Sequence, residues 1–487
     1  MPKLHVCLLA FFAGTGLLQA QQLLTLDQAL EIARQNSPDI LSSLYSLERS
    51  QESLNAQKAA LKSQFVLGLN PLEYSKNRTF DDFSSTWYTN ESFETSGTFT
   101  VSQPILPTDG TLSLVNRFGW QKNNNDYSNT EDEVFTNNLY LSLTQPLFTY
   151  NRLKLEIKEL ELDLENSNLS YAMQKLDLEK EVTQYFYNVY MAQMSLSIAE
   201  DELDNTGKTY EITKNKVEAG LAAKEELYQA ELNYATARSE VQNQRVTLEN
   251  YKDQFKQYIG LDINEEIGVI ADVEAHSVEV DEEMAIQHGL KARMEIRQRE
   301  ISVETSQFDL IETKALNEFE GEMNLSIGII GEDKKFSDMY DNPTRNPSVS
   351  VSFNIPLFDW GEKKSRIKAQ QAVIRQQELS FDQEKIQIVV DIRQICRNLL
   401  NLSNQIEIAR QNEKNAQLTY EINQERYANG DLTSMDLKLY QTQLSENKMA
   451  YAQALIDYKI ELLNLKIQSL YDFERKEAII PEEIMQP

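Results

Sequence analysis

A short stretch that occurs twice decides the fold. Gln145-Pro-Leu-Phe148 is followed by a long helix-forming run, and Ile355-Pro-Leu-Phe358 is followed by another. The two copies lie 210 residues apart, and the same spacing relates Lys216-Val-Glu-Ala-Gly220 to Arg426-Tyr-Ala-Asn-Gly430. Constant spacing over such a distance indicates an internal duplication. The chain of 487 residues therefore contains two related halves.

A third pair of similar segments lies farther upstream. Residues 29–40 resemble residues 285–296, with an offset of 256. Because this offset exceeds the other by 46, the first half contains an insertion of that length between its matched blocks. Each half is expected to run helix, strands, very long helix, turn, helix. The expected organisation is a first repeat over 21–262, an equatorial linker over 263–283, a second repeat over 284–473 and a C-terminal tail over 474–487.

The N-terminus has the pattern of a secretory signal peptide. Lys3 precedes an apolar run over 4–18, and Leu-Gln-Ala at 18–20 fits a cleavage site. The apolar run is too short for a membrane-spanning helix. Residues 1–20 are therefore expected to be removed. The full chain carries a formal charge of −29, and loss of Lys3 makes the charge of the mature chain about −30.

The composition excludes several classes of function. The 76 Asp and Glu residues outnumber the 47 Lys and Arg residues, and this excess would repel nucleic acid. After cleavage the only cysteine is Cys396, so no internal disulfide forms, and three histidines suggest no transition-metal cluster. The sequence contains no nucleophile elbow, P-loop or dinucleotide-binding fingerprint. It therefore predicts no catalytic residues, no cofactor and no enzyme.

Two very long helices are expected. No proline occurs between Leu147 and Asn342, nor between Leu357 and Ile480. Within these runs, residues 151–217 and 361–427 are rich in Glu, Lys, Gln, Leu and Ala, which are good helix formers. Each helix would be roughly 100 Å long. A helix of that length does not fit inside one globular domain, so it must lie in a bundle or bridge two compartments.

Segments with the pattern of β-strands precede each long helix. Residues 323–329 and 349–355 alternate apolar with small polar residues. This alternation is typical of a transmembrane barrel strand, although a one-sided soluble sheet shows it too. The insertion is expected to add one hairpin around a tight turn at 107–110. Four strands are predicted in the first half, over 65–74, 94–106, 111–121 and 138–147, with external loops at 75–92 and 122–136, and two in the second half. The alternative is four strands in total.

These strands require partners from other copies of the chain. Outside the signal peptide, no apolar run approaches the ~20 residues that a membrane helix needs. A membrane protein without such helices must form a closed barrel, because unpaired strand edges cannot face lipid. A barrel of this kind needs at least about eight strands, so the six strands of one chain cannot close it alone. The geometry therefore predicts an oligomeric barrel with helices gathered beneath it.

The same segments resemble a known family. The stretches "QPLF" and "IPLFDWG", at 145–148 and 355–361, enter the long helices, and "KVEAGLAAKEELYQAEL" and "RYANGDLTSMDLKLYQTQL" form the helical tips at 216–232 and 426–444. With the repeat organisation, they make the chain similar to the outer-membrane efflux family, the TolC-like channels, over nearly the whole mature length. The resemblance implies a mixed α+β membrane protein. It would be a homotrimeric β-barrel in outer-membrane lipid, continued by a long α-helical barrel in the periplasm. The best-known members have four strands per subunit, whereas six here would give eighteen per trimer.

The resemblance also implies which residues meet the partners. The helical tips would contact a periplasmic adaptor, also called a membrane fusion protein, which connects the channel to an inner-membrane transporter. Carried over to this sequence, the tips are Gly220-Leu221 and Gly430-Asp431. A simpler interpretation is that both glycines only cap helices.

Further residues are implied at the periplasmic entrance. Glu226 and Asp436 each lie six residues after a tip glycine, and three copies of Asp436 would form a cation-selective ring. Tyr427 would bond Glu226 and hold the entrance closed. The family's second acidic position is Leu439 here and its basic position is Leu432, so the ring is thinner. Alternatively, both acids are ordinary solvated residues of an acidic chain.

The function implied by the resemblance is a passive exit duct for an efflux pump or a type I secretion system. The cargo would be selected by the adaptor and transporter, which this sequence does not contain. One alternative is a non-channel periplasmic coiled-coil or adaptor protein. Another is a secreted enzyme or glycan-binding protein, which would need a polar cleft motif that the sequence lacks.

Overall fold

The structure is a computed structural model that describes residues 22–83, 85–125, 130–271, 273 and 278–479. The expected signal peptide lies outside the described residues, as do parts of the expected linker and C-terminal tail. The chain divides into two compact units. The sheet unit comprises Tyr45–Leu169 and Met294–Lys385, and the helical unit comprises Met1–Leu44, Ser170–Arg293 and Ile386–Pro487. Each unit takes segments from both sequence repeats, because each long helix contributes residues to both.

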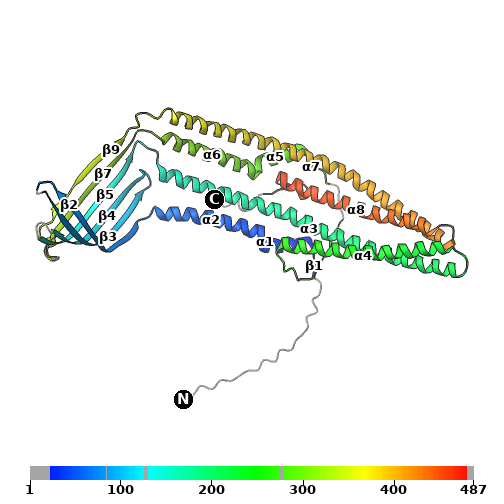
Figure 1. The fold of residues 1–487 in the computed structure, drawn as a ribbon. Helices are drawn as coiled ribbons and strands as arrows, with labels where there is room; N and C mark the ends of the chain where they lie inside the picture. Colours follow the sequence, from blue (N-terminus) through cyan, green and yellow to red (C-terminus); the bar gives the residue numbers. More distant parts are fainter. Residues whose placement is uncertain (1–21, 84, 126–129, 272, 274–277, 480–487) are drawn as a thin grey trace, which may run out of the picture. The chain divides into compact units, whose positions relative to one another are not determined.

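One antiparallel sheet dominates the sheet unit (Figure 1). Its strands follow the order β2-β3-β4-β5-β7-β8, and β9 also pairs with β7. The antiparallel strands expected from the alternating pattern are thereby confirmed. The strands are β2 (Gln64–Asp81), β3 (Thr86–Ile105), β4 (Gly110–Asn125), β5 (Thr130–Leu147), β7 (Glu320–Asp333), β8 (Thr344–Arg345) and β9 (Ser348–Asn354).

The first hairpins are longer than the sequence suggested. The expected loop over 75–92 is mostly strand, because β2 continues to Asp81 and β3 begins at Thr86. Cross-strand side chains explain the difference: the rings of Phe80 and Trp87 lie 5.2 Å apart, and the Arg78 guanidinium lies 5.1 Å from the Trp87 ring. Likewise, β4 and β5 occupy both ends of the expected loop over 122–136.

Long helices follow the strands. α3 (Arg152–Glu218) and α7 (Glu362–Asn429) confirm the helices expected from the two proline-free runs. After a short turn, α3 is followed by α4 (Lys224–Ile259), and α7 by α8 (Ser434–Ser469). No helix in the described ranges combines the length and apolarity needed to cross a membrane.

The helical unit has its own core. Phe186 of α3 packs edge-on against Phe255 of α4, with ring centroids 6.2 Å apart. Both side chains, with Ile259 and Ile267, are at most 1% exposed. The short strands β1 (Gln22–Leu24) and β6 (Ile267–Val269) pair in parallel beside this core. Because β6 belongs to the expected linker, this core packs part of that linker against α3 and α4.

Shorter elements complete the two units. They are α1 (Leu26–Asn36), α2 (Pro38–Ala60), α5 (Glu282–Ala292), α6 (Met294–Ala315), the 3₁₀ helix η1 (Asp338–Tyr340), β10 (Tyr471–Asp472) and β11 (Glu477–Ala478). Along the chain, α2 directly precedes β2, and α6 directly precedes β7. In sequence, each group of strands is therefore preceded by a shorter helix and followed by a long one.

Candidate pore surfaces and helical tips

One face of the sheet is a band of small polar side chains. Successive residues of a strand point to opposite faces, and directly paired residues share a face. Pairing across the sheet aligns one polar row from β2 to β9: Gln64, Ser102, Ser113, Ser142, Ser326 and Ser348. The hydroxyls of Ser326 and Ser348 lie 2.8 Å apart. The row next to it toward the helices contains Thr111, Thr144, Asn324 and Ser350. This face suits contact with water.

The opposite face is apolar and exposed. The register aligns Phe65, Val101, Leu114, Leu141 and Ile327 in one row. Ile327 is 65% exposed in the single chain, and Phe65 is 69% exposed. A contiguous apolar face of this extent marks a surface that another apolar phase covers. An outward apolar band over a polar interior is the pattern of a transmembrane barrel.

Aromatic side chains gather at both ends of the apolar face. Toward the long helices, the Phe148, Phe319 and Phe353 rings lie within 5.3 to 6.4 Å of one another. Toward the far end, the Phe336 ring makes edge contacts with Phe118 and Phe135, at 5.7 and 6.1 Å. Aromatic girdles of this kind flank the apolar band of membrane barrels at the two lipid–water interfaces.

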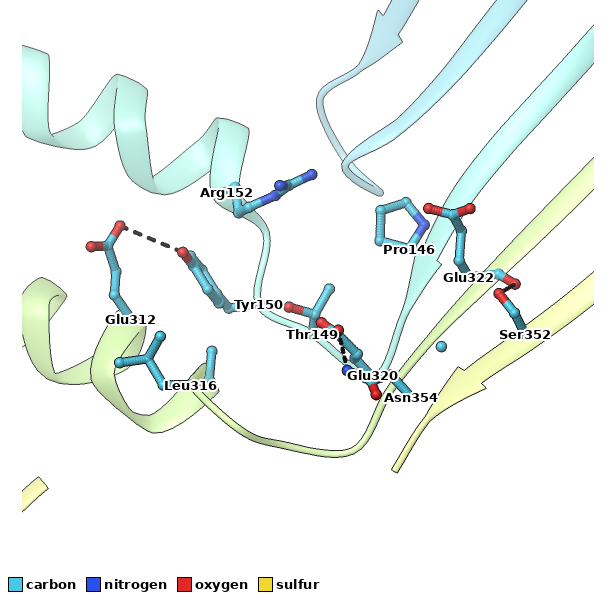
Figure 2. A pocket seen from close by; sticks show the side chains of 12 residues that line it. Pro146, Thr149, Tyr150, Arg152, Glu312, Leu316, Glu320, Glu322, Ser352 and Asn354 are labelled. Atoms are coloured by element: carbon cyan, nitrogen blue, oxygen red, sulfur yellow. Dashed lines mark hydrogen bonds between the residues drawn. The ribbon is translucent and has the colours of Figure 1, made fainter. Parts of the chain in front are cut away.

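A cavity of about 570 Å³ lies where strands β5, β7 and β9 meet the helices (Figure 2). The Tyr150 hydroxyl donates to Glu312 Oε1 at 3.5 Å. Burial and the nearby Glu312 carboxylate raise the pKa of Tyr150 above its usual value. The Asn354 amide donates to Glu320 Oε1 at 3.0 Å. The first contact joins the β5–α3 connection to α6, and the second joins β9 to β7. Across the part of the chain that the structure describes, no group of three metal-ligating side chains occurs.

The turn between β3 and β4 anchors the start of α3. Asp109 is buried and has a left-handed backbone, with φ of +58°. Its carboxylate accepts from Arg152 Nε at 3.1 Å and from the Leu153 backbone N–H at 3.3 Å. The carboxylate thereby satisfies a free N–H of the first helical turn. The turn expected at 107–110 is therefore also a helix-anchoring element.

We expect Asp109→Ala to lower the free energy of unfolding by about 2 kcal/mol. Alanine removes both acceptors and disfavours the left-handed backbone. The measurement is denaturant unfolding of the purified protein. Asp109→Asn is the matched control, because asparagine tolerates this backbone and keeps one acceptor, so its loss should be smaller. Equal midpoints for wild type and Asp109→Ala would contradict the anchoring role.

Each long helix ends at a left-handed glycine. Gly220 has φ of +74° and Gly430 has φ of +87°, and nothing lies within 4 Å of a Cβ built on either. The Leu221 N–H donates to the Lys216 carbonyl at 2.8 Å, and the Asp431 N–H donates to the Arg426 carbonyl at 2.9 Å. This bonding is the Schellman motif, so the glycines have a capping role. Beyond them, Leu221 is 79% exposed, which leaves an apolar side chain at the first tip.

Tyr427 does not bond Glu226 in the structure. Its side chain is buried and its hydroxyl lies 3.2 Å from Thr213 Oγ1 of α3. The Lys216 ammonium lies 5.1 Å from the Tyr427 ring centroid. Glu226 is exposed in the first turn of α4 and, among the described residues, has no side-chain hydrogen bond. The expected latch partner is therefore replaced by Thr213, because Tyr427 faces α3 rather than the start of α4.

Asp436 is exposed at the start of α8 and helps to cap that helix. The Thr433 side chain accepts from the Asp436 N–H at 3.2 Å and donates to Asp436 Oδ2 at 2.7 Å. The corresponding position in the first repeat, Ala223, has no side-chain cap. The cap follows from the sequence Thr433-Ser-Met-Asp436, a Thr-x-x-Asp capping pattern. The local role of Asp436 is compatible with an entrance ring, because its second carboxylate oxygen has no bond to Thr433.

An ion pair between α8 and α3 was not expected from the sequence. Lys438 Nζ of α8 donates to Glu202 Oε1 of α3 at 2.7 Å, and both side chains are partly buried. Nearby, Leu437 joins Tyr420 and Tyr427 in a small buried cluster. Two contacts therefore hold α7 and α8 against α3: the Thr213–Tyr427 hydrogen bond and the Glu202–Lys438 ion pair. No local pattern reveals an ion pair between residues 236 positions apart.

Comparison with known proteins agrees with this geometry. The model of the family described as "Outer membrane efflux protein" matches residues 111–261 and 322–467, which is more than half of the chain. A search of the curated proteins finds no match.

Solved outer-membrane channels share the fold. The Campylobacter jejuni CmeC outer membrane channel is 13% identical with a TM-score of 0.71, covering 95% of this chain and 88% of that one. The Vibrio cholerae outer membrane protein VceC is 14% identical with a TM-score of 0.64, covering 92% and 95%. The open-state Neisseria gonorrhoeae MtrE outer membrane channel is 13% identical with a TM-score of 0.65, covering 93% and 90%. With the two matched repeats and the two-faced sheet, these findings identify the chain as a member of the outer membrane efflux protein family, a non-enzymatic channel of the outer membrane.

Proposed function

We propose that three copies of this chain assemble into one passive exit duct through the outer membrane. The observation that carries the proposal is the sheet, with one polar and one apolar face and two unpaired edges. Among the described residues, β2 pairs only with β3, and β9 only with β7. A sheet edge cannot face lipid, so other copies must complete the wall.

The long helices support the same assembly. Along α7, a row of apolar side chains is exposed at helical spacing, including Ile386 (64%), Leu400 (70%), Ile408 (61%) and Ile422 (60%). An exposed apolar stripe on a long helix is suited to packing against a helix of a second copy. The three sets of helices would then form the periplasmic part of the duct.

The assembly can be tested directly. Mature protein that begins after residue 20 should fractionate with the outer membrane and run as a trimer in unheated detergent gels. A monomer in the periplasm would contradict both the trimer and the outer-membrane location, and it would favour the non-channel coiled-coil alternative.

The helical tips are proposed to meet the partners. Gly220-Leu221 and Gly430-Asp431 would contact a periplasmic adaptor that brings an inner-membrane transporter to the duct. The exposed Leu221 side chain supports this, because it offers an apolar anchor at the end of a rigid helical hairpin. The energy for export and the choice of cargo would come from the transporter and adaptor of a pump or type I secretion system.

The entrance is proposed to be held closed by contacts within each chain. Opening would move α7 and α8 away from α3, which breaks the Thr213–Tyr427 and Glu202–Lys438 contacts. In this arrangement Glu226 and Asp436 would add negative charge near the entrance and favour cations.

Asp436→Asn is expected to reduce the cation-over-anion permeability of the trimer several-fold. Asparagine keeps an oxygen that accepts from Thr433, so the helix cap survives while three carboxylates are lost. The measurement is the reversal potential of single channels in a salt gradient. Glu446→Gln is the control, because it removes an exposed carboxylate farther along α8. Equal selectivity for both variants would exclude an entrance ring at Asp436.

A further inference from the structure

The β2–β3 hairpin has no counterpart in the second repeat. The first residues of β4 and β7, Gly110 and Glu320, lie at the repeat spacing of 210, so β4 corresponds to β7 and β5 to β9. The segment Gln64–Asp109, which holds β2, β3 and the following turn, contains 46 residues, the same number by which the two sequence offsets differ. The repeat spacing and the length of the segment therefore both mark the hairpin as an insertion.

The inserted hairpin has the two faces of a barrel wall. Phe65, Leu67 and Leu69 of β2 lie on the apolar face, and residues between them lie on the polar face. Its strand β3 pairs continuously with β4, from Ile105 opposite Gly110 to Asn90 opposite Asn125. A plug inside the pore would need polar side chains on both faces. The hairpin is therefore built as part of the wall.

The regular part of β2, at one edge of the sheet, has the same length as β9, at the other edge. A bulge between Asn70 and Glu73, with Pro71 inside it, ends the regular part of β2 after seven residues, Gln64–Asn70. β9, Ser348–Asn354, also has seven residues. β9 alternates apolar with small polar residues, and β2 carries Phe65, Leu67 and Leu69 on alternate positions with one further apolar residue, Val66, on the other face. The sheet order makes β9 antiparallel to a β2 placed beside it. In such a pair, apolar residues of both strands face the lipid.

We propose that the inserted hairpin widens the pore. β2 of each copy pairs with β9 of the next, so a trimer has an eighteen-stranded wall instead of the twelve strands formed without residues 64–109. This inference rests on the proposed trimer. Barrel diameter grows in proportion to strand number, so the wall is about 1.5 times as wide, in the range of barrels that enclose an open aqueous channel. The barrel then passes solutes of larger cross-section, and the size limit of the duct lies at the helical tips.

Size-graded labelling inside the barrel tests the width. The protein carries Cys396→Ser together with Ser326→Cys, which places one thiol in the middle of the polar face. Intact cells are treated with maleimide–polyethylene glycols of increasing mass, which enter from outside whether or not the periplasmic tips are open. The same thiol is tested in a variant lacking residues 64–109, in which Ser63 connects α2 directly to β4. Lys335→Cys, exposed beyond the end of β7, is the control that every polymer should label in both proteins.

We expect the full-length barrel to admit polymers that the shortened barrel excludes. An equal size limit in two stable trimers would overturn the inference and leave the proposed function intact. Absence of trimers from the full-length protein would instead contradict the proposed function.

Cross-linking of the full-length chain tests the edge even if the shortened protein does not fold. Single cysteines at Phe65, Leu67 or Leu69 are combined with single cysteines at Val349, Val351 or Phe353, again with Cys396→Ser. At least one combination should form a disulfide between copies, because Cα atoms of opposed antiparallel residues lie about 4.5–5.5 Å apart. Cysteine at Gly68 with each β9 cysteine is the control, since it lies on the opposite face. Trimers without any specific cross-link would overturn the pairing.

Discussion

Leu141→Arg should remove most of the assembled protein from the outer membrane. Leu141 lies midway along the apolar face, between Leu114 and Ile327 in the paired strands. A lipid-facing arginine at the middle of a bilayer costs about 2–4 kcal/mol in each copy of a barrel protein. A trimer contains three such positions, so the total is comparable to the whole stability of a small protein domain.

The neighbouring residue provides a matched control. Ser142→Arg places the same side chain on the polar face, where water can solvate it. Both variants are fractionated and compared as unheated trimers on detergent gels. Ser142→Arg should assemble close to wild-type levels. Equal assembly of the two variants would show that the faces have been assigned the wrong way round or that the sheet does not contact lipid.

Combining Tyr427→Phe with Lys438→Ala should open the entrance. The first change removes the hydroxyl that lies 3.2 Å from Thr213, and the second removes the ion pair with Glu202. Each contact contributes about 1 kcal/mol, so losing both shifts the closed-to-open ratio roughly thirty-fold. Single-channel recordings of purified trimers should show longer and larger openings.

Single variants separate the two contacts. Tyr427→Phe and Lys438→Ala alone should each give a smaller increase in open probability than the double variant. Lys448→Ala is the control, because it removes a lysine of the same helix that has no ion pair among the described residues. Unchanged gating in the double variant would exclude these contacts as the closing device and would point to contacts between copies.

The elements that depend on local sequence were predictable. Helix propensity and the absence of proline are properties of the segment itself, so α3 and α7 agree with the expected ranges to within two residues. The tip glycines were found because both repeats carry them at the same place. The strands were found through alternation, but their outer ends were missed. Stretches such as 76–81 carry charged residues, and only cross-strand contacts with β3 keep them extended.

The partners of the entrance residues were not predictable from the sequence alone. The family resemblance pairs Tyr427 with Glu226, whereas in the structure the Tyr427 hydroxyl lies beside Thr213, which is 214 residues away in sequence. Nothing in the segment around Thr213 distinguishes it from other polar helix residues. Which residues meet depends on the rotation of each long helix about its axis, and a chain rich in Glu, Lys and Gln does not specify that rotation locally.

The unequal strand lengths have a consequence at the cell surface. Pairing of β4 with β5 continues outward to Asn125 and Thr130, whereas pairing of β5 with β7 ends at Phe135 and Asp333. The rim that faces the surroundings is therefore supplied mainly by the first repeat. Antibodies and bacteriophages that approach the cell would meet this half first. Immune or phage pressure on the protein would act on the first repeat, while the second could keep its sequence.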